Sequence, residues 1–364
     1  MRRRRGRRRS LRGFARGGAL LVAVAMCVGC APQLVDDDYT RGTRSLPLLE
    51  GGFDGRIGLT FLGVGGWLIE TPRTQVLTAP LFSNPSIWRT GLGTIRADST
   101  AIVDGLRRFG VDDLSGVTAI LSGHAHYDHL MDVPWIAARL SPRARVLVNT
   151  TGQRTLAPIA DSLGLDRSRI VDVSSFAADV EGGGTWIRLG PDVRLLPLRS
   201  DHAPHFAGLT LYDGTRGSDL VRPPRSAEEW LEGETLAFLL EVADAGGGRP
   251  VRIYVQDAVA REPWGFVPPR YAPVDLAILV PATYAEVDWH PEAILENTRA
   301  RHVALGHWEN FFAPPSADPE PVAFTLLPDF IARLRRAVSG DDSRWTLPMP
   351  GTRLELGRLR NDSR

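Results

Sequence analysis

The stretch LSGHAHYDHLMDVP, residues 121–134, holds three of the eight histidines of this 364-residue chain and two aspartates. The apolar run VTAIL (117–121) comes directly before it and predicts a buried strand that ends near Gly123, where the chain can turn. His124 and His126 are two residues apart, so in an extended segment both side chains leave the backbone on the same side. Asp128 and His129 follow, just before a helix expected near residues 132–134.

Imidazoles and carboxylates gathered at the end of a buried strand form a site that Zn²⁺, Fe²⁺ or Mn²⁺ accepts. The alternative, a set of scattered surface histidines, gives no packing reason for one strand to deliver so many donors. Four donors from one loop cannot complete the coordination of two metals. We therefore expect further ligands from other strand ends.

Three other apolar runs are each followed by a titratable residue that suits this role: His202, Asp257 and His307. A core histidine would lie inside such a run rather than after it. His205 is an alternative to His202, either as the ligand or as a residue beside a ligand or the substrate. We expect His202 to be the ligand because it comes first after its strand.

Apolar runs and helical patterns together predict a layered α/β fold. Expected strands cover two runs within 56–71, then 117–122, 145–149, 194–200, 235–242, 251–257, 275–280 and 302–307, and expected helices cover 98–110, a stretch after 132, 154–164, 291–301 and 321–338. Strands occur in groups as well as alternating with helices, which favours two sheets covered by outer helices over one doubly wound sheet. The glycines at 63, 65 and 66 indicate a hairpin bend, since no phosphate-loop motif fits them. The polar segment 213–233 is interpreted as an insertion or lid.

The motif HxHxDH, followed by a His, an Asp and a His after later strands, resembles the metallo-β-lactamase superfamily. More narrowly, FLGVGGWLIET, LPLRSDHAPHF and ALGHWENF resemble the branch of the N-acyl-phosphatidylethanolamine phospholipase D and the L-ascorbate-phosphate lactonase-like hydrolases. This resemblance implies an αββα sandwich of two mixed β-sheets flanked by helices, with the site at one edge between the sheets. The sequence departs from the pattern of this branch at two positions. It has Ala79 where the branch often has Asp, and Gln256 where the branch often has Gly.

The resemblance also implies a ligand set and a reaction. One metal ion would be held by His124, His126 and His202, the second by Asp128, His129 and His307, and both by a bridging Asp257. Two divalent ions are expected, Zn²⁺ before Fe or Mn. A metal-bound hydroxide would cleave an ester, lactone, amide or phosphodiester bond, with a lipid-like substrate among the options. The two aspartates, Asp128 and Asp257, would be catalytic by orienting the water and relaying its proton.

Two other function classes remain open on the residues alone. One is a non-catalytic metal-binding envelope lipoprotein that retains the fold, with Ala79 and Gln256 as its sequence support. The other is a redox variant with two iron ions, although no flavin or electron-transfer domain is apparent.

The amino-acid composition excludes several kinds of chemistry. Both cysteines, Cys27 and Cys30, lie near the N-terminus, so the body of the chain has no thiolate ligand, cysteine nucleophile or disulfide. The chain has no lysine, which rules out a Schiff-base lysine and a Walker-type phosphate site. Residues 1–29 hold nine arginines and no acid, so the rest carries a net charge of −8, which argues against nucleic acid as a partner.

The N-terminus resembles an export signal. A basic segment and a 10-residue apolar run precede Gly29 and Cys30, which predicts a signal segment at 1–29 and lipid attachment at Cys30. Residues 30–55 are expected to be a tether and 56–364 the hydrolase domain. We thus expect an exported envelope lipoprotein anchored in the membrane through Cys30 and facing the periplasm or exterior. An ordinary cleaved signal or a retained N-terminal anchor are the alternatives, and the oligomeric state is not predicted.

Several other residues could take part in binding or catalysis, but a purely structural role is an alternative interpretation for each of them. His290 is assigned to a helix start or the surface, with a pocket position as the alternative, and His302 to the core or a sheet edge. Tyr284 is equally compatible with a pocket or a rim position. Four aromatic residues could line a substrate channel: Trp230, Trp308, Phe311 and Phe312. For Trp308, Phe311 and Phe312, packing in the core is the first expectation.

Overall fold

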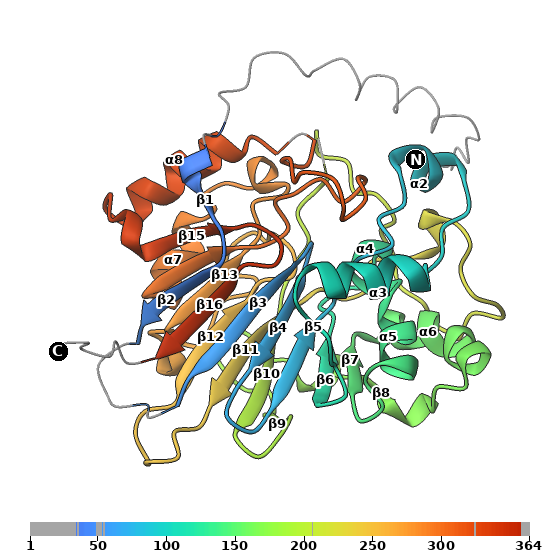
Figure 1. The fold of residues 1–364 in the computed structure, drawn as a ribbon, viewed down its shortest axis with the longest axis horizontal. Coiled ribbons are helices and arrows are strands. Elements are labelled where there is room, and N and C mark those ends of the chain that lie inside the picture. Colours follow the sequence, from blue (N-terminus) through green and yellow to red (C-terminus); the bar gives the residue numbers. More distant parts are fainter. Residues whose placement is uncertain are drawn as a thin grey trace, which may run out of the picture. The chain divides into compact units, whose positions relative to one another are not determined.

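The structure, a computed structural model, describes residues 34, 36–48, 53, 55–205, 207–323 and 325–357. Its architecture is two eight-stranded mixed β-sheets with helices on their outer faces, as Figure 1 shows. The predicted αββα sandwich is therefore confirmed. The predicted signal segment 1–29 and Cys30 lie outside the described residues. No helix in the described part of the chain has the length and apolar character needed to cross a membrane.

The first sheet is built mainly from the N-terminal half of the chain. Its strands, in spatial order, are β2 (Thr43–Pro47), β16 (Arg353–Gly357), β3 (Ile57–Gly63), β4 (Gly66–Glu70), β5 (Gln75–Thr78), β6 (Val117–Leu121), β7 (Arg145–Val148) and β8 (Ile170–Asp172). Strands β5 to β8 are parallel, whereas β16, β3, β4 and β5 are antiparallel neighbours. The glycines between β3 and β4 form a hairpin in which Gly63 pairs with Gly66, as predicted.

The second sheet comes mainly from the C-terminal half. Its spatial order is β1 (Tyr39–Thr40), β15 (Trp345–Pro348), β14 (His302–Leu305), β13 (Leu276–Leu279), β12 (Val251–Val255), β11 (Leu236–Val242), β10 (Val193–Arg199) and β9 (Ile187–Arg188). Strands β12 to β15 are parallel, and β9 to β12 are antiparallel neighbours. Because β10 and β12 both run against β11, they end at the same edge as β14.

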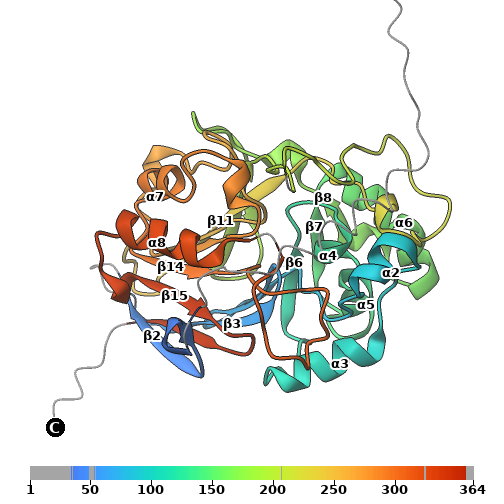
Figure 2. The same ribbon diagram turned by 90° about the horizontal axis from the view of Figure 1, so that it is seen from above.

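Two hydrophobic cores hold the layers together. The larger core fills the space between the sheets and continues to α7 (Glu292–Thr298) and α8 (Leu327–Ala337) on the second sheet. The smaller core joins the first sheet to α3 (Ser99–Arg108), α5 (Val133–Arg139) and α6 (Thr150–Leu163). Figure 2 shows these two groups of helices on opposite sides of the sandwich. This arrangement buries both faces of the parallel strands, which explains their continuous apolar runs.

Local capping residues fix where the helices of the first sheet begin and end. The Asp98 carboxylate accepts hydrogen bonds from the backbone N–H groups of Thr100 and Ala101 at the start of α3. The Asn149 side chain does the same for Gly152 in α6, which ends at Gly164 with a left-handed φ of 67°.

The structure differs from the expectations in several segments, and the strands β5, β8, β9, β15 and β16 were not among those expected. Part of the expected tether is folded, because β1 pairs with β15 and β2 with β16, which adds an edge strand to each sheet. The helix predicted from residue 321 begins only at Leu327, after a bridge between Glu309 and Pro321. Short helices α2 (Ile87–Leu92) and α4 (Tyr127–Leu130) were not predicted, because neither is long enough to show a helical period.

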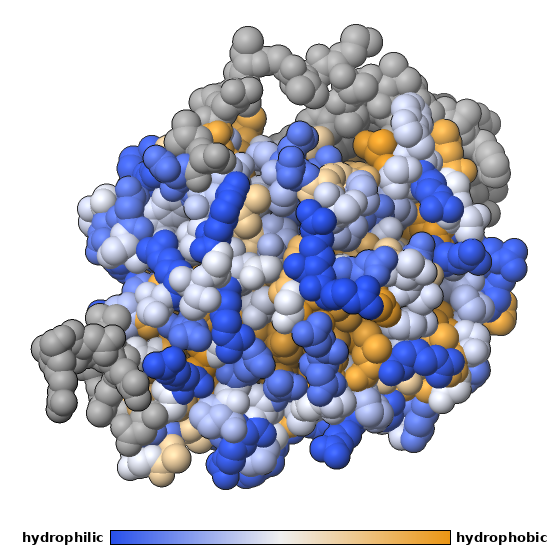
Figure 3. All heavy atoms as spheres, in the orientation of Figure 1, coloured by the Kyte–Doolittle hydropathy of each residue, from blue (hydrophilic) through white to orange (hydrophobic). Residues whose placement is uncertain are grey.

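The outer face of the first sheet is polar where no helix covers it. Arg353 on β16 forms ion pairs with Glu70 and Glu355, and Arg56 pairs with Glu355. Hydrophilic side chains accordingly dominate much of the face drawn in Figure 3. This face can therefore remain in water without a covering layer.

Candidate metal centre

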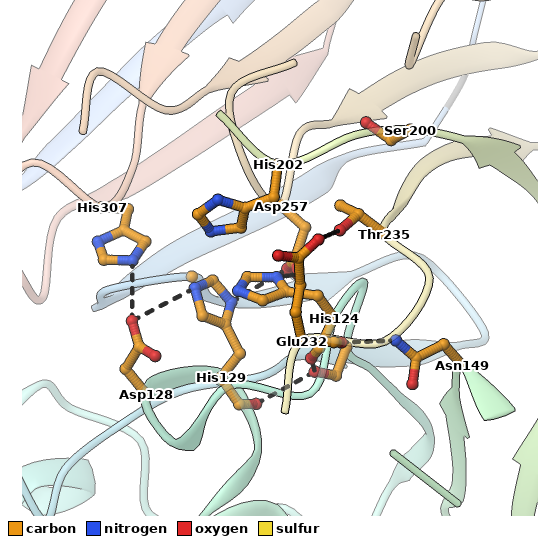
Figure 4. A network of polar contacts seen from close by, with 12 residues as sticks. His124, Asp128, His129, Asn149, Ser200, His202, Glu232, Thr235, Asp257 and His307 are labelled. Atoms are coloured by element: carbon orange, nitrogen blue, oxygen red, sulfur yellow. Dashed lines mark hydrogen bonds and ion pairs between the residues drawn. The ribbon is translucent and has the colours of Figure 1, made fainter. Parts of the chain in front are cut away.

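The strand ends of both sheets meet at one edge of the sandwich. The loop after β6 carries four of the predicted ligands, and the ends of β10, β12 and β14 carry one each. Figure 4 shows these side chains turned toward one another from loops of both sheets. The six predicted ligands labelled there are His124, Asp128, His129, His202, Asp257 and His307. The carboxyl ends of strands thus form the site, as is usual for sheets that include parallel strands.

Three groups of side chains bring their donor atoms within 4.8 Å of one another. The groups are His124, His126 and His202; His124, His129 and Asp257; and Asp128, His129 and His307. All seven residues predicted from the sequence are therefore brought together. The first and last groups coincide with the two ligand sets implied by the resemblance.

Asp257 connects the two ligand sets. Its Oδ2 lies 2.7 Å from Nδ1 of His124, and its Oδ1 lies 3.3 Å from Nδ1 of His129. Burial raises the pKa of Asp257, but the charge of His129 and hydrogen bonds from both histidines outweigh it and hold the pKa well below its usual range. The carboxylate is thus ionised and presents one oxygen to each set.

Asp128 faces the second set. Its Oδ2 lies 3.3 Å from Nε2 of His307 and 3.7 Å from Nε2 of His129. Burial raises the pKa of Asp128, but His129 and His307 outweigh this and lower it well below its usual value. The Asp128 side chain is 12% exposed, compared with 3% for Asp257. Of the two aspartates, Asp128 is therefore the more accessible.

The donor set fits divalent cations. Burial lowers the pKa of His124 to about 3, and it also lowers the pKa values of His126 and His202, so these imidazoles are neutral and can bind a metal. Nε2 of His126 is buried and has no hydrogen-bond partner among the described residues. Buried polar atoms without partners are costly, and a bound cation would remove that cost.

Gly123 is required for the close approach of the two sheets. A Cβ at this position would lie 2.2 Å from the backbone oxygen of Leu236 and 2.5 Å from Cβ of Asp257. The Leu236 N–H also donates to the Gly123 carbonyl at 2.8 Å. The sequence suggested a turn at this glycine, but its φ is not in the positive range that glycine alone favours. Its role is instead to let Asp257 reach the histidines.

Two residues that were not singled out from the sequence hold the site loops in place. Asp132 accepts hydrogen bonds from the backbone N–H groups of Phe82 and Ser83 and from the Ser83 hydroxyl. Glu309 accepts from the N–H of Val64, whose carbonyl in turn accepts from the N–H of His307 at 2.8 Å. These two acids gave no sequence signal, because their partners are groups distant in the chain, most of them backbone N–H groups.

The two departures from the family pattern do not disturb the ligands. The Gln256 side chain turns to β13, where it accepts from the N–H of Val280. Ala79 is fully buried at the end of β5, and Gly65 packs between its carbonyl and the His129 ring. Neither residue takes a ligand's place.

The remaining histidines and aromatics have mostly structural positions. His290 Nε2 contacts the Val280 carbonyl, and His302 Nε2 contacts the Pro47 carbonyl, so both link segments of the fold. Tyr284 is buried and donates to the Leu326 carbonyl, which makes it structural. Trp308 and Trp230 are core residues.

Of the four aromatic residues considered from the sequence, Phe311 is the one whose ring lies against that of a predicted ligand. Its ring centroid lies 5.1 Å from that of His307 and 4.5 Å from that of Phe312. The segment 213–233, interpreted above as a lid, packs on α6, where Arg216 contacts Thr151 and Thr155.

A separate hollow lies at the other end of the strands. It has a volume of about 450 Å³ and is lined in part by Trp186, Arg194 and Glu241 near the start of β10 and the end of β11. It contains none of the predicted ligands, so its size does not bear on the metal centre.

No family model and no curated protein matches this sequence. Among solved structures, the chain is similar to Igni18, a metallo hydrolase of Ignicoccus hospitalis, with 13% identity and a TM-score of 0.47 over 83% of this chain and 99% of that one. It is similar to CmlA, a diiron β-hydroxylase of Streptomyces venezuelae, with 13% identity and a TM-score of 0.49 over 85% of this chain and 55% of that one.

The chain is also similar to the metallo-β-lactamase fold protein YhfI of Bacillus subtilis, with 12% identity and a TM-score of 0.40 over 84% of this chain and 97% of that one. These identities and TM-scores are too low to assign a reaction or a metal to this chain.

Proposed function

We propose that this chain is a dinuclear metal-dependent hydrolase. The observation that carries the proposal is the position of Asp257, whose two oxygens divide between His124 and His129. Besides the group that they share with Asp257, His124 belongs to the group with His126 and His202, and His129 belongs to the group with Asp128 and His307, and each of these two groups could hold an ion. A single-ion site would need only one group, so a shared carboxylate favours two ions.

His124, His126 and His202 would hold one ion, Asp128, His129 and His307 the other, and Asp257 both. The donors are nitrogen and oxygen only, which suits Zn²⁺ and also Fe or Mn. When bound, such ions supply Lewis acidity and make water a stronger nucleophile at neutral pH. The substrate class we propose is an ester, lactone, amide or phosphodiester.

The protein's own groups position the reactants. Asp128 is the more accessible carboxylate, so we assign to it the orientation of the attacking water and acceptance of its proton. Asp257 has both oxygens engaged by histidines and acts by holding the two sets together. Phe311 and Phe312 beside His307 offer an apolar wall to the substrate, which favours a substrate with an apolar portion. Attachment to a membrane through Cys30 would agree with a lipid-like substrate and is part of this proposal.

Metal stoichiometry tests the proposal most directly. Elemental analysis of the purified protein, loaded with Zn²⁺ and desalted, should give two ions per chain. His126→Ala and His307→Ala should each leave one ion, whereas Asp257→Asn should weaken binding at both positions. His290→Ala is the matched control, because that histidine is buried but lies outside the three donor groups, and it should retain both ions. One ion per wild-type chain would contradict the proposal.

Turnover is tested separately with 4-nitrophenyl esters, lactones, amides and bis(4-nitrophenyl) phosphate. We expect at least one class to be hydrolysed, with activity lost on chelation and restored by Zn²⁺ or Mn²⁺. Two bound ions with no hydrolysis of any class would instead support the non-catalytic metal-binding alternative.

A further inference from the structure

His205 lies against the first ligand set without belonging to it. Its ring stacks on that of His202 with a centroid distance of 4.8 Å and an interplanar angle of 22°, and its centroid is 5.4 Å from that of His126. The residue is only partly buried. His202 and His205 both come from the sequence HAPH, and the sequence alone left open which of them binds metal.

The backbone partners of the two histidines distinguish their roles. Nδ1 of His202 lies 2.6 Å from the Ala203 carbonyl oxygen, which can only accept, so Nδ1 carries the proton and Nε2 is free to bind a metal. Nδ1 of His205 lies 3.1 Å from the backbone nitrogen of Leu211, which can only donate. In His205 the proton therefore sits on Nε2, and that nitrogen is a hydrogen-bond donor.

A protonated ring nitrogen cannot bind a cation, because metal binding requires its lone pair. No residue in the described part of the chain accepts a hydrogen bond from Nε2 of His205. The donor is consequently available to a molecule that occupies the site beside His126 and His202.

The turn next to His205 is held by hydrogen bonds to Glu286, which lies in the connection after β13. The backbone N–H groups of Ala207 and Gly208 donate to the two carboxylate oxygens of Glu286, each at 2.7 Å. The N–H of His205 also donates to the Leu209 carbonyl at 2.8 Å. Ala207 and Gly208 have left-handed φ values of 46° and 72°, and the Glu286 contacts hold this backbone shape. Glu286 is thus a positioning residue for His205.

We propose that His205 is a substrate-binding residue that donates its Nε2–H to a carbonyl or phosphoryl oxygen next to the His124, His126 and His202 set. This assignment rests on the proposed function. A donor placed there would bind the oxygen on which negative charge develops during hydrolysis, a role in which one donor contributes substantially to the rate.

Two substitutions separate the two nitrogens of the ring. In the His205→Asn variant, the side-chain oxygen can accept a hydrogen bond near the position of Nδ1, but no donor lies at the position of Nε2. Gln in His205→Gln can place an amide N–H near the position of Nε2 but cannot accept from Leu211. The first test measures binding of inorganic phosphate to the Zn²⁺-loaded protein by calorimetry. Loss of one hydrogen bond to the charged phosphate should weaken phosphate binding by H205N by about tenfold or more, with H205Q recovering a large part of the loss.

The second test records the ¹⁵N-histidine spectrum of the protein, with H205N used to assign the signal that disappears. We expect the His205 signal to show the Nε2–H tautomer and that of His202 the Nδ1–H tautomer. Thermal melting of both variants accompanies these measurements, to show that each is folded.

The outcomes separate this inference from the proposed function. Loss of an ion in either His205 variant would overturn the inference by making His205 a ligand. Equal phosphate affinity in the wild type and H205N, or no phosphate binding by a wild type that holds two ions, would also overturn it while leaving the dinuclear centre intact. Fewer than two ions in the wild type would refute the proposed function itself.

Discussion

The two sheets have the same construction but contribute to the site in different ways. Each has eight strands, with a parallel part and an antiparallel part. The first sheet delivers four donors from one loop after β6, whereas the second delivers three isolated donors after β10, β12 and β14. A cluster in one loop needs only local contacts to stay together. Isolated donors depend on how the two sheets approach each other, so changes at the junction should matter more than changes within the loop.

The contacts on the two sides reflect this difference. The loop of the first sheet is held by Asp132 and by Ser122, whose hydroxyl donates to the His124 carbonyl at 2.8 Å. The His307 loop of the second sheet is held by Glu309 through Val64, which belongs to the β3–β4 hairpin of the first sheet. The following variants test this contrast, from the largest expected effect to the smallest.

Gly123→Ala should have the largest effect, because it changes the point where the sheets touch. The added Cβ would collide with the backbone at Leu236 and with Asp257, at a cost of about 3 kcal/mol in the free energy of unfolding. Displacement of Asp257 should also weaken the binding of both ions. Urea unfolding and elemental analysis measure the two effects.

Gly217→Ala is its control, since no atom lies within 4 Å of a Cβ there. If G123A were as stable as G217A and kept both ions, the close approach of the sheets at Gly123 would not be needed for stability or for metal binding.

Asp132→Asn should show a pH-dependent effect within the first sheet's loop. Burial raises the pKa of Asp132 to about 6, above the value of 3.8 expected when it is exposed in the unfolded chain. The folded chain therefore binds this proton more tightly, and the stability it contributes is present below pH 4 and lost as the pH rises to 6. Because Asn stays neutral, D132N should gain about 2–3 kcal/mol relative to the wild type between pH 4 and pH 7.

Asn can retain the Asp132 contacts, with its carbonyl accepting from the backbone N–H groups and its amide donating to Ser83 Oγ, which itself accepts from the Asp98 N–H. Unfolding is measured with chelator present throughout, so that metal release does not contribute. A stability difference that is constant with pH would contradict this prediction.

Glu309→Ala should cost about 2 kcal/mol, because it leaves the buried N–H of Val64 without an acceptor. Since Val64 also binds the His307 backbone, the variant should lose affinity for the ion held by Asp128, His129 and His307 while keeping the other. Glu309→Gln retains an acceptor oxygen and should lie within about 1 kcal/mol of the wild type. Metal titration of both variants checks this, and equal losses in E309A and E309Q would disprove the assigned contact.

Ser122→Ala should have the smallest effect, about 1 kcal/mol, from the loss of one buried hydrogen bond to the loop backbone. Both ions should be retained, because the other contacts of the loop remain. Ser162→Ala removes an exposed hydroxyl that also donates to a backbone carbonyl and should change stability by less than about 0.5 kcal/mol. Loss of an ion in S122A would show that the loop is less self-supporting than we infer.

Much of the sheet structure was predictable from periodicity, since β6, β7 and the strands from β10 to β14 follow apolar runs. The edge strands β1 and β2 were not, because they are short and polar and are stabilised by pairing with β15 and β16 from the other end of the chain. The helix predicted from residue 321 begins only at Leu327, and Pro321 forms a bridge to Glu309 instead. Tertiary contacts overrode local propensity in each case.

By itself, the sequence determined which residues are candidate donors, because histidines and aspartates placed directly after apolar runs have few uses other than chemistry. The tertiary structure alone decided how the donors divide into sets, since that depends on distances between residues more than a hundred positions apart, such as His124 and Asp257. It also supplies the basis for our proposal that His202 rather than His205 is the ligand, because a ring nitrogen's role follows from the backbone group it faces, and no sequence pattern records that group.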